Sequence, residues 1–424
     1  MVRVHQTFES VRIDDIRAAT LRELERLDLG RKVKRGETVA ITVGSRGIAN
    51  IATITKGIVD HIKTLGGVPF IVPAMGSHGG ATAEGQRDLI AGYGVTAEAM
   101  GCEVRSSMDT VVVDTTPQGI PVHFDRNASE ADHVVVAGRV KPHTGFVGEI
   151  ESGLHKMMLI GLGKHRGACI YHKAIKDFSF GEIIHAVADV VLRKCRVLAG
   201  LAIIENASDE TALIEAVAPA DFFERERALL KQARAWLPRL PVADVDLLIV
   251  DEIGKNISGT GMDTNVVGRK YNDHAATELD DARCRRIYIR SLTEATHGNA
   301  CGLGLAEFTN RRTVEQVDHA YTKVNCITAG HPTAGMIPLV YETDQEAISD
   351  ALQTIGLTAP ENARVVHIQN TLQLHDVYVS EACLPEVRKA SHIHVEGEPA
   401  AMAFDADANL RSVREQCGGT ESQP

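Results

Sequence analysis

Short apolar segments alternate along this chain with longer segments in which apolar residues recur at helical spacing. The segment 38–45 (TVAITVGS) reads as a strand, and 48–67 has helical periodicity and ends at a Gly-Gly pair. The same order returns at 68–80 and again from His133. Strands alternating with helices are typical of a mainly parallel sheet covered by helices. The sequence therefore predicts an α/β fold.

The chain is long enough for more than one such domain, with 424 residues. A helical pattern over 219–241 looks like a connector, and a new strand-like segment follows it. We therefore predict an N-terminal α/β domain over 1–241 that includes this connector, a second α/β domain over 242–375, and a C-terminal extension and tail over 376–424. Mainly parallel sheets are expected in both domains, with a cleft between them. The polar segment after Arg411 is expected to be loose.

Charge and composition narrow the class of protein. The formal net charge of -11 argues against nucleic acid or an anionic membrane surface as the main partner. The first twenty residues lack the apolar core of a signal peptide, and we see no apolar segment long enough to span a bilayer. Eight cysteines without close pairs favour reduced, mostly buried thiols rather than a disulfide framework or a cysteine zinc site. These features predict a cytoplasmic protein.

Polar residues follow three of the predicted strands. They are Ser45-Arg46, the segment 77–80 (SHGG), and the segment 141–143 (KPH). Each alone is an ordinary surface loop as readily as a functional one. Ligands of open parallel sheets bind at the carboxyl ends of strands, and a single sheet brings these ends to one edge. Together the three loops predict an active site.

The run 139–178 combines many glycines with four histidines, His143, His155, His165 and His172. Glycines let the backbone approach a ligand closely, yet the run has neither a Walker loop nor a dinucleotide fingerprint. His165 and His172 are about two helical turns apart and can share a helix face. Two imidazoles with a third histidine suit zinc, nickel or iron. For His155, His165 and His172, an internally bonded structural role is the alternative.

Within this run, KPHTGF and GEIESGLHKMMLIGLGK, followed by GA and YH, resemble the nickel-pincer-dependent lactate racemase family and its wider group of 2-hydroxyacid racemases and epimerases. The resemblance is best from Arg46 to Phe178. In that family a Pro-His pair precedes a lysine, and a histidine follows the lysine by sixteen residues. Here Pro142-His143 precedes Lys156, and His172 follows at that spacing.

The resemblance implies a cofactor and its attachment. Family members carry a nickel-pincer nucleotide, pyridinium-3,5-bisthiocarboxylic acid mononucleotide nickel, joined to a lysine through a thioamide. The cofactor holds nickel by sulfur, carbon and sulfur, and a histidine supplies a further ligand. The resemblance gives Lys156 the covalent role and His172 the nickel-binding role. It also implies cofactor-biosynthesis proteins as partners.

The resemblance further implies an isomerase that racemises or epimerises a small anionic 2-hydroxyacid by reversible hydride transfer. His78 and His143 fall on the two acid/base histidines, whose ordinary pKa suits proton transfer in both directions near neutrality. Arg46 falls on a family arginine. Arg46 or Lys141 can hold the cofactor or a substrate carboxylate.

The chain departs from the lactate enzymes in ways that favour a substrate other than lactate. Its first loop, VGSRGIAN, lacks their aspartate and proline, and PHTGFVGE replaces PHFFAG. In the second domain, Lys255, Asn256 and Asp263 are candidates for contacting a larger or more polar substrate. His297 and His331 follow later strands and are weaker candidates. Ordinary turn and loop roles are the alternatives for Lys255, Asn256 and Asp263.

Two other functions use the same residues. A zinc-dependent hydrolase would use His143, His165 and His172, but it needs an acidic general base near the metal, which the run does not clearly provide. A non-catalytic binding protein for an anionic metabolite would use Arg46 and Lys141. The binding function gives no reason for the position of His172.

Overall fold

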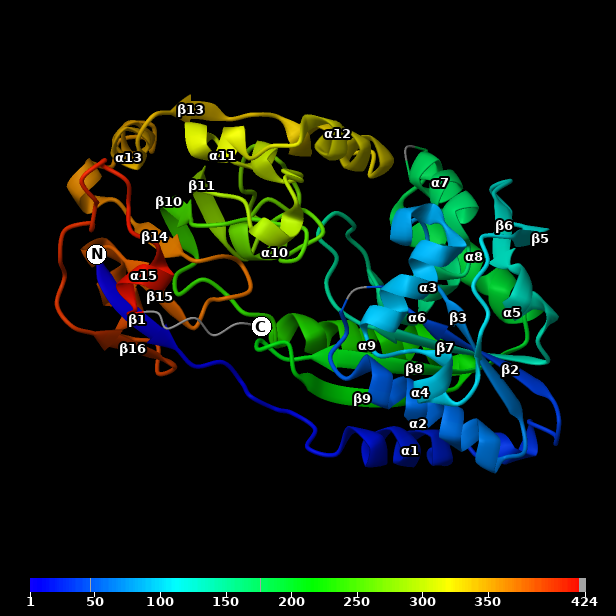
Figure 1. Ribbon diagram of the computed structural model, residues 1–424. Helices are drawn as coiled ribbons and strands as arrows, with labels where there is room; N and C mark the ends of the chain where they lie inside the picture. Colours follow the sequence, from blue (N-terminus) through cyan, green and yellow to red (C-terminus); the bar gives the residue numbers. More distant parts are fainter. Residues whose placement is uncertain (46, 176, 419–424) are drawn as a thin grey trace. The chain divides into compact units, whose positions relative to one another are not determined.

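The computed structural model describes residues 1–45, 47–175 and 177–418. The chain divides into two compact units, each built on a sheet with helices around it (Figure 1). The N-terminal unit is Glu9–Leu237, and the C-terminal unit combines Met1–Phe8 with Pro238–Pro424. Both sheets are mainly parallel, so the predicted α/β fold is confirmed. The cleft between domains stays a prediction.

The main sheet of the N-terminal unit contains the three strands predicted at 38–45, at 68–80 and from His133. Its strands are β2 (Thr38–Val43), β3 (Val68–Pro73), β4 (Glu103–Val104), β7 (His133–Arg139), β8 (Val197–Glu205) and β9 (Thr211–Val217). Their order is β4-β3-β2-β7-β8-β9, and all neighbours are parallel except β8 and β9. A separate antiparallel hairpin consists of β5 (Thr110–Thr115) and β6 (Pro121–Asp125).

This sheet has a hydrophobic core on each face. In β7, Val134 and Val136 belong to one core, whereas Val135 and Ala137 belong to the other. Side chains alternate between faces along a strand, so burial on both faces explains the unbroken apolar run. Helices α1 (Ile16–Arg26) and α2 (Ile51–Thr64) supply residues to one core, and α8 (Phe180–Lys194) and α9 (Phe222–Ala235) to the other. The remaining helices are α3 (Ala83–Gly92), α4 (Ala97–Met100), α5 (Arg126–Glu130), α6 (Gly153–Lys156) and α7 (Lys164–Ala174).

The C-terminal unit has a mixed sheet. Its strands are β1 (Val2–Gln6), β10 (Asp244–Val250), β11 (Arg283–Ile289), β12 (Phe308–Asn310), β13 (Leu339–Tyr341), β14 (Val365–Ile368), β15 (Asp376–Val379) and β16 (Ile393–Glu396). In the order β13-β12-β11-β10-β14-β15-β1-β16, the first five strands are parallel and the others are antiparallel. Its helices are α10 (Thr264–Val267), α11 (Arg311–Glu315), α12 (His319–Thr328), α13 (Asp344–Gln353), α14 (Leu384–Val387) and α15 (Val413–Gln416).

The division differs from the predicted domains at both ends of the chain. The first residues were expected in the domain 1–241, but β1 pairs with β15 on one side and β16 on the other. These pairings place β1 and the predicted extension 376–424 in the C-terminal unit, up to the last described residue. The buried side chains of Val2 and Val4 join its core, so apolar burial and backbone pairing together fix this placement.

The predicted connector is part of the N-terminal unit. Helix α9 buries Phe222, Leu229, Leu230 and Ala233 in the core on one face of the sheet. This apolar stripe at helical spacing packs against the unit rather than bridging solvent. The chain passes into the second unit between Leu237 and Pro238.

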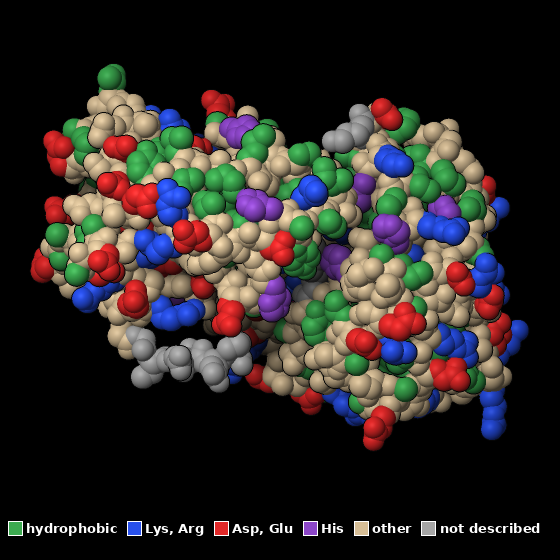
Figure 2. Space-filling model, turned by 45° about the horizontal axis from the view of Figure 1, so that its top comes forward, with side chains coloured by type: hydrophobic (Ala, Val, Ile, Leu, Met, Phe, Trp, Pro, Cys, Tyr) green, Lys and Arg blue, Asp and Glu red, His purple; other side chains and the backbone are tan. Residues whose placement is uncertain are grey.

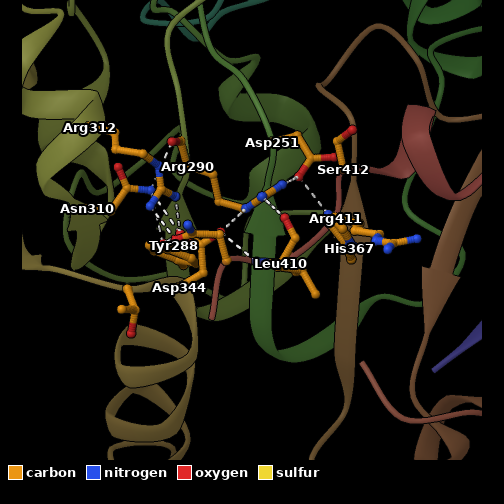
Figure 3. Close-up of polar contacts among 12 residues, drawn as sticks. Asp251, Tyr288, Arg290, Asn310, Arg312, Asp344, His367, Leu410, Arg411 and Ser412 are labelled. Carbon is orange, nitrogen blue, oxygen red and sulfur yellow. Dashed lines mark hydrogen bonds and ion pairs between the residues drawn. The ribbon is translucent and has the colours of Figure 1, made fainter. Parts of the chain in front are cut away.

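The described part of the segment after Arg411, residues 412–418, has a defined structure, contrary to our expectation of a loose tail. Figure 3 shows Arg290 reaching the carboxylates of both Asp251 and Asp344. Asp344 accepts the backbone N–H of Leu410 at 3.0 Å, and Asp251 accepts that of Val413 at 2.6 Å. A buried ion network therefore holds the segment that leads into α15, whose N-terminus also has a capping box.

The surface carries charged side chains of both signs. Acidic and basic side chains alternate over the face shown in Figure 2, with histidines among them. Within the described part of the chain, no helix is long and apolar enough to cross a membrane.

Asp344→Asn is expected to lower the free energy of unfolding of the C-terminal unit by about 3 kcal/mol, because it leaves the largely buried Arg290 and the partly exposed Arg312 with less compensation. Burial acts to raise the pKa of Asp344, but the charge of Arg290 and the Tyr288 hydroxyl outweigh burial and lower it. The ionised carboxylate therefore stabilises the fold above the unfolded pKa of about 3.9, and this contribution is lost as the pH falls through the lower folded pKa.

Urea unfolding followed by circular dichroism checks this at pH 7 and in acid. The exposed Asp407→Asn serves as the matched control. Equal unfolding midpoints for the wild type and Asp344→Asn at pH 7 would show that the network contributes little.

Candidate active site

The carboxyl ends of β2, β3 and β7 lie next to one another because β2 pairs in parallel with both other strands. Ser45 follows β2, His78 follows β3, and the segment 140–143 follows β7. The Ser45 hydroxyl lies 2.5 Å from His78 Nδ1. The predicted convergence is therefore observed directly for two of the three loops. Arg46, predicted beside them, lies outside the described residues.

The side chain of Gln86 in α3 fixes the loop that carries His78. The buried Gln86 amide donates to the carbonyl oxygens of Gly76 at 2.9 Å and His78 at 3.2 Å. Gly79 has φ +64°, and a Cβ there would lie 2.6 Å from the backbone nitrogen of Gln86, so this position requires glycine. On the other side, the Tyr93 hydroxyl donates to the Ser45 carbonyl at 2.7 Å. His78 is thus fixed through both its ring and its backbone.

The loop after β7 is organised by the buried carboxylate of Glu151. Glu151 accepts the backbone N–H of His143 at 2.8 Å and of Gly148 at 3.2 Å, and it accepts Arg234 of α9 at 2.6 Å. The Ser152 hydroxyl accepts the Lys141 N–H at 2.7 Å and donates to the Lys141 carbonyl at 2.6 Å. These bonds give a glycine-rich loop a defined conformation.

Hydrogen bonds define the tautomer of His143. Its Nδ1 accepts the backbone N–H of Gly145 at 3.0 Å and of Phe146 at 3.1 Å. A nitrogen that accepts hydrogen bonds carries no proton, so the hydrogen of the neutral ring is on Nε2. In this conformation His143 presents an N–H donor at Nε2. It becomes a base at Nε2 only when Nδ1 leaves the two backbone donors and takes the proton.

Phe146 brings three predicted site residues together. Its ring stacks on His143 with centroids 4.2 Å apart and an interplanar angle of 13°. The His172 ring centroid lies 6.2 Å from it, and Lys156 Nζ lies 5.7 Å from its centroid. Phe180 stacks on Phe146 at 4.2 Å. An amine and two imidazoles from different elements therefore surround one aromatic ring.

Lys156 is positioned by the buried carboxylate of Glu226 on α9. Glu226 accepts the N–H groups of Leu154 and His155 at the start of α6, and it also bonds the His155 ring. Such a cap satisfies free N–H groups at a helix N-terminus. The absence of a side chain at Gly153 leaves room for this carboxylate, since a Cβ there would lie 1.8 Å from a Glu226 oxygen. His155 therefore has the structural role proposed as its alternative.

After Lys156 the chain continues as a π-helical segment, Met157–Gly161, before α7 begins. Such segments are rare and frequent at functional sites. Met157 packs against the end of β7, where a Cβ at Gly138 would lie 2.7 Å from its side chain. This packing fixes the segment next to Lys156 on the sheet.

His172 lies in the last turn of α7 and is half-buried. Burial lowers its pKa, and the nearby charge of Lys156 lowers it further. The neutral imidazole is the form that binds a metal. The predicted pair of Lys156 and His172 is thus close enough to interact electrostatically.

The contacts of His165, the remaining predicted histidine of this unit, are less suited to binding a metal. The exposed His165 contacts Cys169 at 3.6 Å on the same helix. Over residues 1–45, 47–175 and 177–418, no group of three or more His, Cys, Asp or Glu side chains is arranged to hold a metal. The zinc-hydrolase alternative, which required His143, His165 and His172 together, has no support here. Burial and the charge of Glu205 raise the pKa of Asp209. The charge of Lys141 acts in the opposite direction.

The candidates in the C-terminal unit make internal bonds. Lys255 Nζ donates to the Gly259 carbonyl at 2.5 Å, and the Thr293 hydroxyl donates to Asn256 at 2.6 Å. Asp263 caps α10 by accepting the Asn265 N–H. His297 ends a short 3₁₀ turn with φ +50°. The bonds of Lys255, Asn256 and Asp263 are compatible with the turn and loop roles given as alternatives, and substrate contact stays a prediction. His331 likewise bonds Asp273 at 2.5 Å.

Sequence reasoning missed three residues that organise the site. They are Phe146, Glu151 and Glu226. Phe146 lies three residues after His143 in a glycine-rich loop. This short separation is a signal that the two rings can contact each other. Glu226 lies in an amphipathic helix and has no local signal.

The segment that holds this cluster is similar to a known domain. Residues 10–182 match the family model of the lactate racemase N-terminal domain. They include His78, His143, Lys156 and His172. A comparison with curated proteins gave no match.

Two solved structures are similar to the chain. The lactate racemase apoprotein from Thermoanaerobacterium thermosaccharolyticum has 15% sequence identity, covering 85% of this chain and 82% of that chain with a TM-score of 0.50. A protein from Thermotoga maritima has 13% identity, covering 65% of this chain and 69% of that chain with a TM-score of 0.46. The first likeness agrees with the fold described above.

The hydrogen bonds of His143 make its tautomer measurable. In the apoprotein, ¹⁵N NMR of the imidazole is expected to show an unprotonated Nδ1 and a protonated Nε2 at neutral pH, because two backbone N–H groups occupy Nδ1. The signals are assigned by their loss in His143→Ala. The solvent-exposed His165 is expected to sample both tautomers and serves as the internal reference. A protonated Nδ1 in His143 would contradict this geometry.

Proposed function

Through residues 10–182 this chain belongs to the lactate racemase family, and we propose on that premise that it racemises or epimerises a small 2-hydroxyacid with a lysine-bound nickel-pincer nucleotide. Family membership supports an isomerase of the racemase type. The observation that carries the finer proposal is the convergence of Lys156, His172 and His143 on Phe146. A tethering amine, a metal-binding imidazole and a proton-handling imidazole are the three groups that such a reaction requires.

The residues present fit the proposed cofactor. Lys156 has a primary amine that can form the covalent link. His172, whose pKa is lowered, offers a neutral nitrogen to nickel. One imidazole is enough because the cofactor supplies its own sulfur and carbon ligands, which agrees with a site that has no cluster of three protein ligands among the described residues. When bound, the cofactor accepts and returns the hydride of the substrate carbon.

We assign the hydroxyl proton to His78 and His143. His78 is positioned by Ser45, and its ring and its backbone are both held. His143 first offers Nε2–H as a hydrogen-bond donor to a substrate oxygen. It removes a proton only after its Nδ1 has left the N–H groups of Gly145 and Phe146, so a rearrangement of the loop 143–146 accompanies that half of the reaction. The half-buried surroundings of this loop strengthen such polar contacts.

The carboxylate of the substrate requires a cation. Arg46 and Lys141 are proposed for this role, since guanidinium binds a carboxylate in a bidentate manner and ammonium binds it as a point charge. Lys255, Asn256, Asp263 and His297 remain proposed substrate contacts of the C-terminal unit. Their present internal bonds would be exchanged for bonds to the substrate.

Protein made in cells that also make the cofactor is expected to carry a covalent mass increment. Lys156→Ala is expected to lose this increment because the tethering amine is absent. His172→Ala is expected to keep it but to lose most of its nickel. Intact-mass spectrometry and elemental analysis measure the two effects. Lys173→Ala, an exposed lysine on the same helix as His172, is the matched control. An increment that survives in Lys156→Ala would overturn the tether.

Racemisation is expected for at least one member of a panel of 2-hydroxyacids with short, long, acidic and polyhydroxylated side chains. His78→Ala and His143→Ala are each expected to lower kcat by about a hundred- to ten-thousand-fold, the usual effect of losing a general acid/base. Chiral chromatography measures the rates in preparations with equal cofactor content. Binding of an acid without turnover in the loaded wild type would favour the anion-binding alternative instead.

A further inference from the structure

A buried ion pair lies close to the candidate site but outside the residues assigned so far. Lys164, the first residue of α7, places Nζ 3.1 Å from Asp125 Oδ2 at the end of β6, and neither side chain is exposed. Burial lowers the pKa of Lys164 and raises that of Asp125, while each charge opposes the shift of the other. A charged pair in this setting requires good geometry and further hydrogen bonds.

The backbone of Lys164 is also unusual. Its φ is +53°, a left-handed conformation that non-glycine residues adopt rarely. It comes shortly after the π-helical segment Met157–Gly161, and the residue before it, Gly163, packs so tightly that a Cβ there would lie 2.3 Å from the Leu159 carbonyl oxygen. Strained residues of this kind concentrate at functional sites.

The contacts of the ammonium group lead to the loop that carries His78. Besides Asp125, Lys164 Nζ donates to the carbonyl of Pro73, the last residue of β3, and lies 3.4 Å from Gln86 Oε1. The Pro73 and Gln86 oxygens accept hydrogen bonds from the ammonium group, and the Asp125 carboxylate pairs with it as an ion. Gln86 in turn donates to the carbonyls of Gly76 and His78. The ammonium therefore holds both the start of the loop and the side chain that fixes its middle.

The same residue starts the helix that carries His172. Lys164 thus joins two segments with different proposed tasks, the proton-transfer loop after β3 and the metal-binding helix α7. We propose that Lys164, paired with Asp125 and acting through Gln86, is a positioning residue that sets the place of His78 relative to α7. Its catalytic consequence rests on the proposed function, whereas its effect on His78 does not.

Three variants separate positioning from simple packing. Gln86→Met removes only the link between the ammonium and the loop. Lys164→Met removes the ammonium. Lys164→Met combined with Asp125→Leu replaces the whole ion pair by apolar groups, a change that often restores stability. Lys173→Met on the exposed side of α7 is the matched control.

The first readout is the imidazole NMR signal of His78 in the apoprotein, identified by its loss in His78→Ala. All three test variants are expected to shift or broaden this signal, whereas Lys173→Met leaves it unchanged. The double variant is decisive: thermal unfolding recovers towards that of the wild type, but the His78 signal stays altered. If Lys164→Met does not fold, Gln86→Met and the double variant carry the test. An unchanged His78 signal in the folded variants, or one restored with stability in the double variant, would overturn the proposal.

The second readout is turnover of the cofactor-loaded protein. The test variants are expected to keep the mass increment at Lys156 but to lose about a hundredfold in kcat, with KM changed less than about threefold, because a small displacement of a proton-transfer group acts on the reaction step. A loss confined to KM contradicts positioning. If the loaded wild type shows neither increment nor racemisation, the proposed function fails, and the His78 signal still decides the role of Lys164.

Discussion

Parallel pairing of β2 with both β3 and β7 is the constraint on which the rest of the candidate site depends. In a parallel sheet the carboxyl ends of neighbouring strands lie at one edge, so Ser45, His78 and the loop 140–143 start from adjacent points. The covering helices then return the chain to the same edge. Helix α6 brings Lys156 and α7 brings His172. Moving any of these strands by one place in the sheet would separate loops that now begin at adjacent points.

Buried charged groups convert this coarse arrangement into defined geometry. Glu151 and Glu226 accept backbone N–H groups from glycine-rich segments that have few side chains of their own to fix them. Lys164 acts as a donor instead, and its ammonium group donates to the carbonyl at the end of β3. A buried carboxylate or ammonium is stable only when its hydrogen bonds are made. Each of these groups therefore requires one backbone conformation, which gives the candidate site a defined geometry.

The contacts that fix the side chains of the candidate site also affect which of their atoms can take part in chemistry. His143 stacks on Phe146 and uses Nδ1 to accept two backbone N–H groups, an arrangement that stabilises its loop but withholds Nε2 from service as a base. Burial lowers the pKa of His172, and the charge of Lys156 lowers it further. Conversion of that amine into an amide-like link would remove the charge, so cofactor attachment would alter the electrostatics of the neighbouring imidazole. Attachment and metal binding are therefore coupled in the proposed function.

The sequence by itself determined the elements and many of the candidate groups. Apolar periodicity is a local property, so it indicated the strands, the α/β class and the loops at strand ends, and the spacing of Lys156 and His172 was readable along the chain. Tertiary structure alone decided that β1 pairs between β15 and β16, that α9 supplies Glu226 to α6, and that Asp125 meets Lys164. These contacts join residues far apart in sequence. No local pattern specifies them, because the free energy that selects them comes from burying side chains and satisfying polar groups of the whole unit at once.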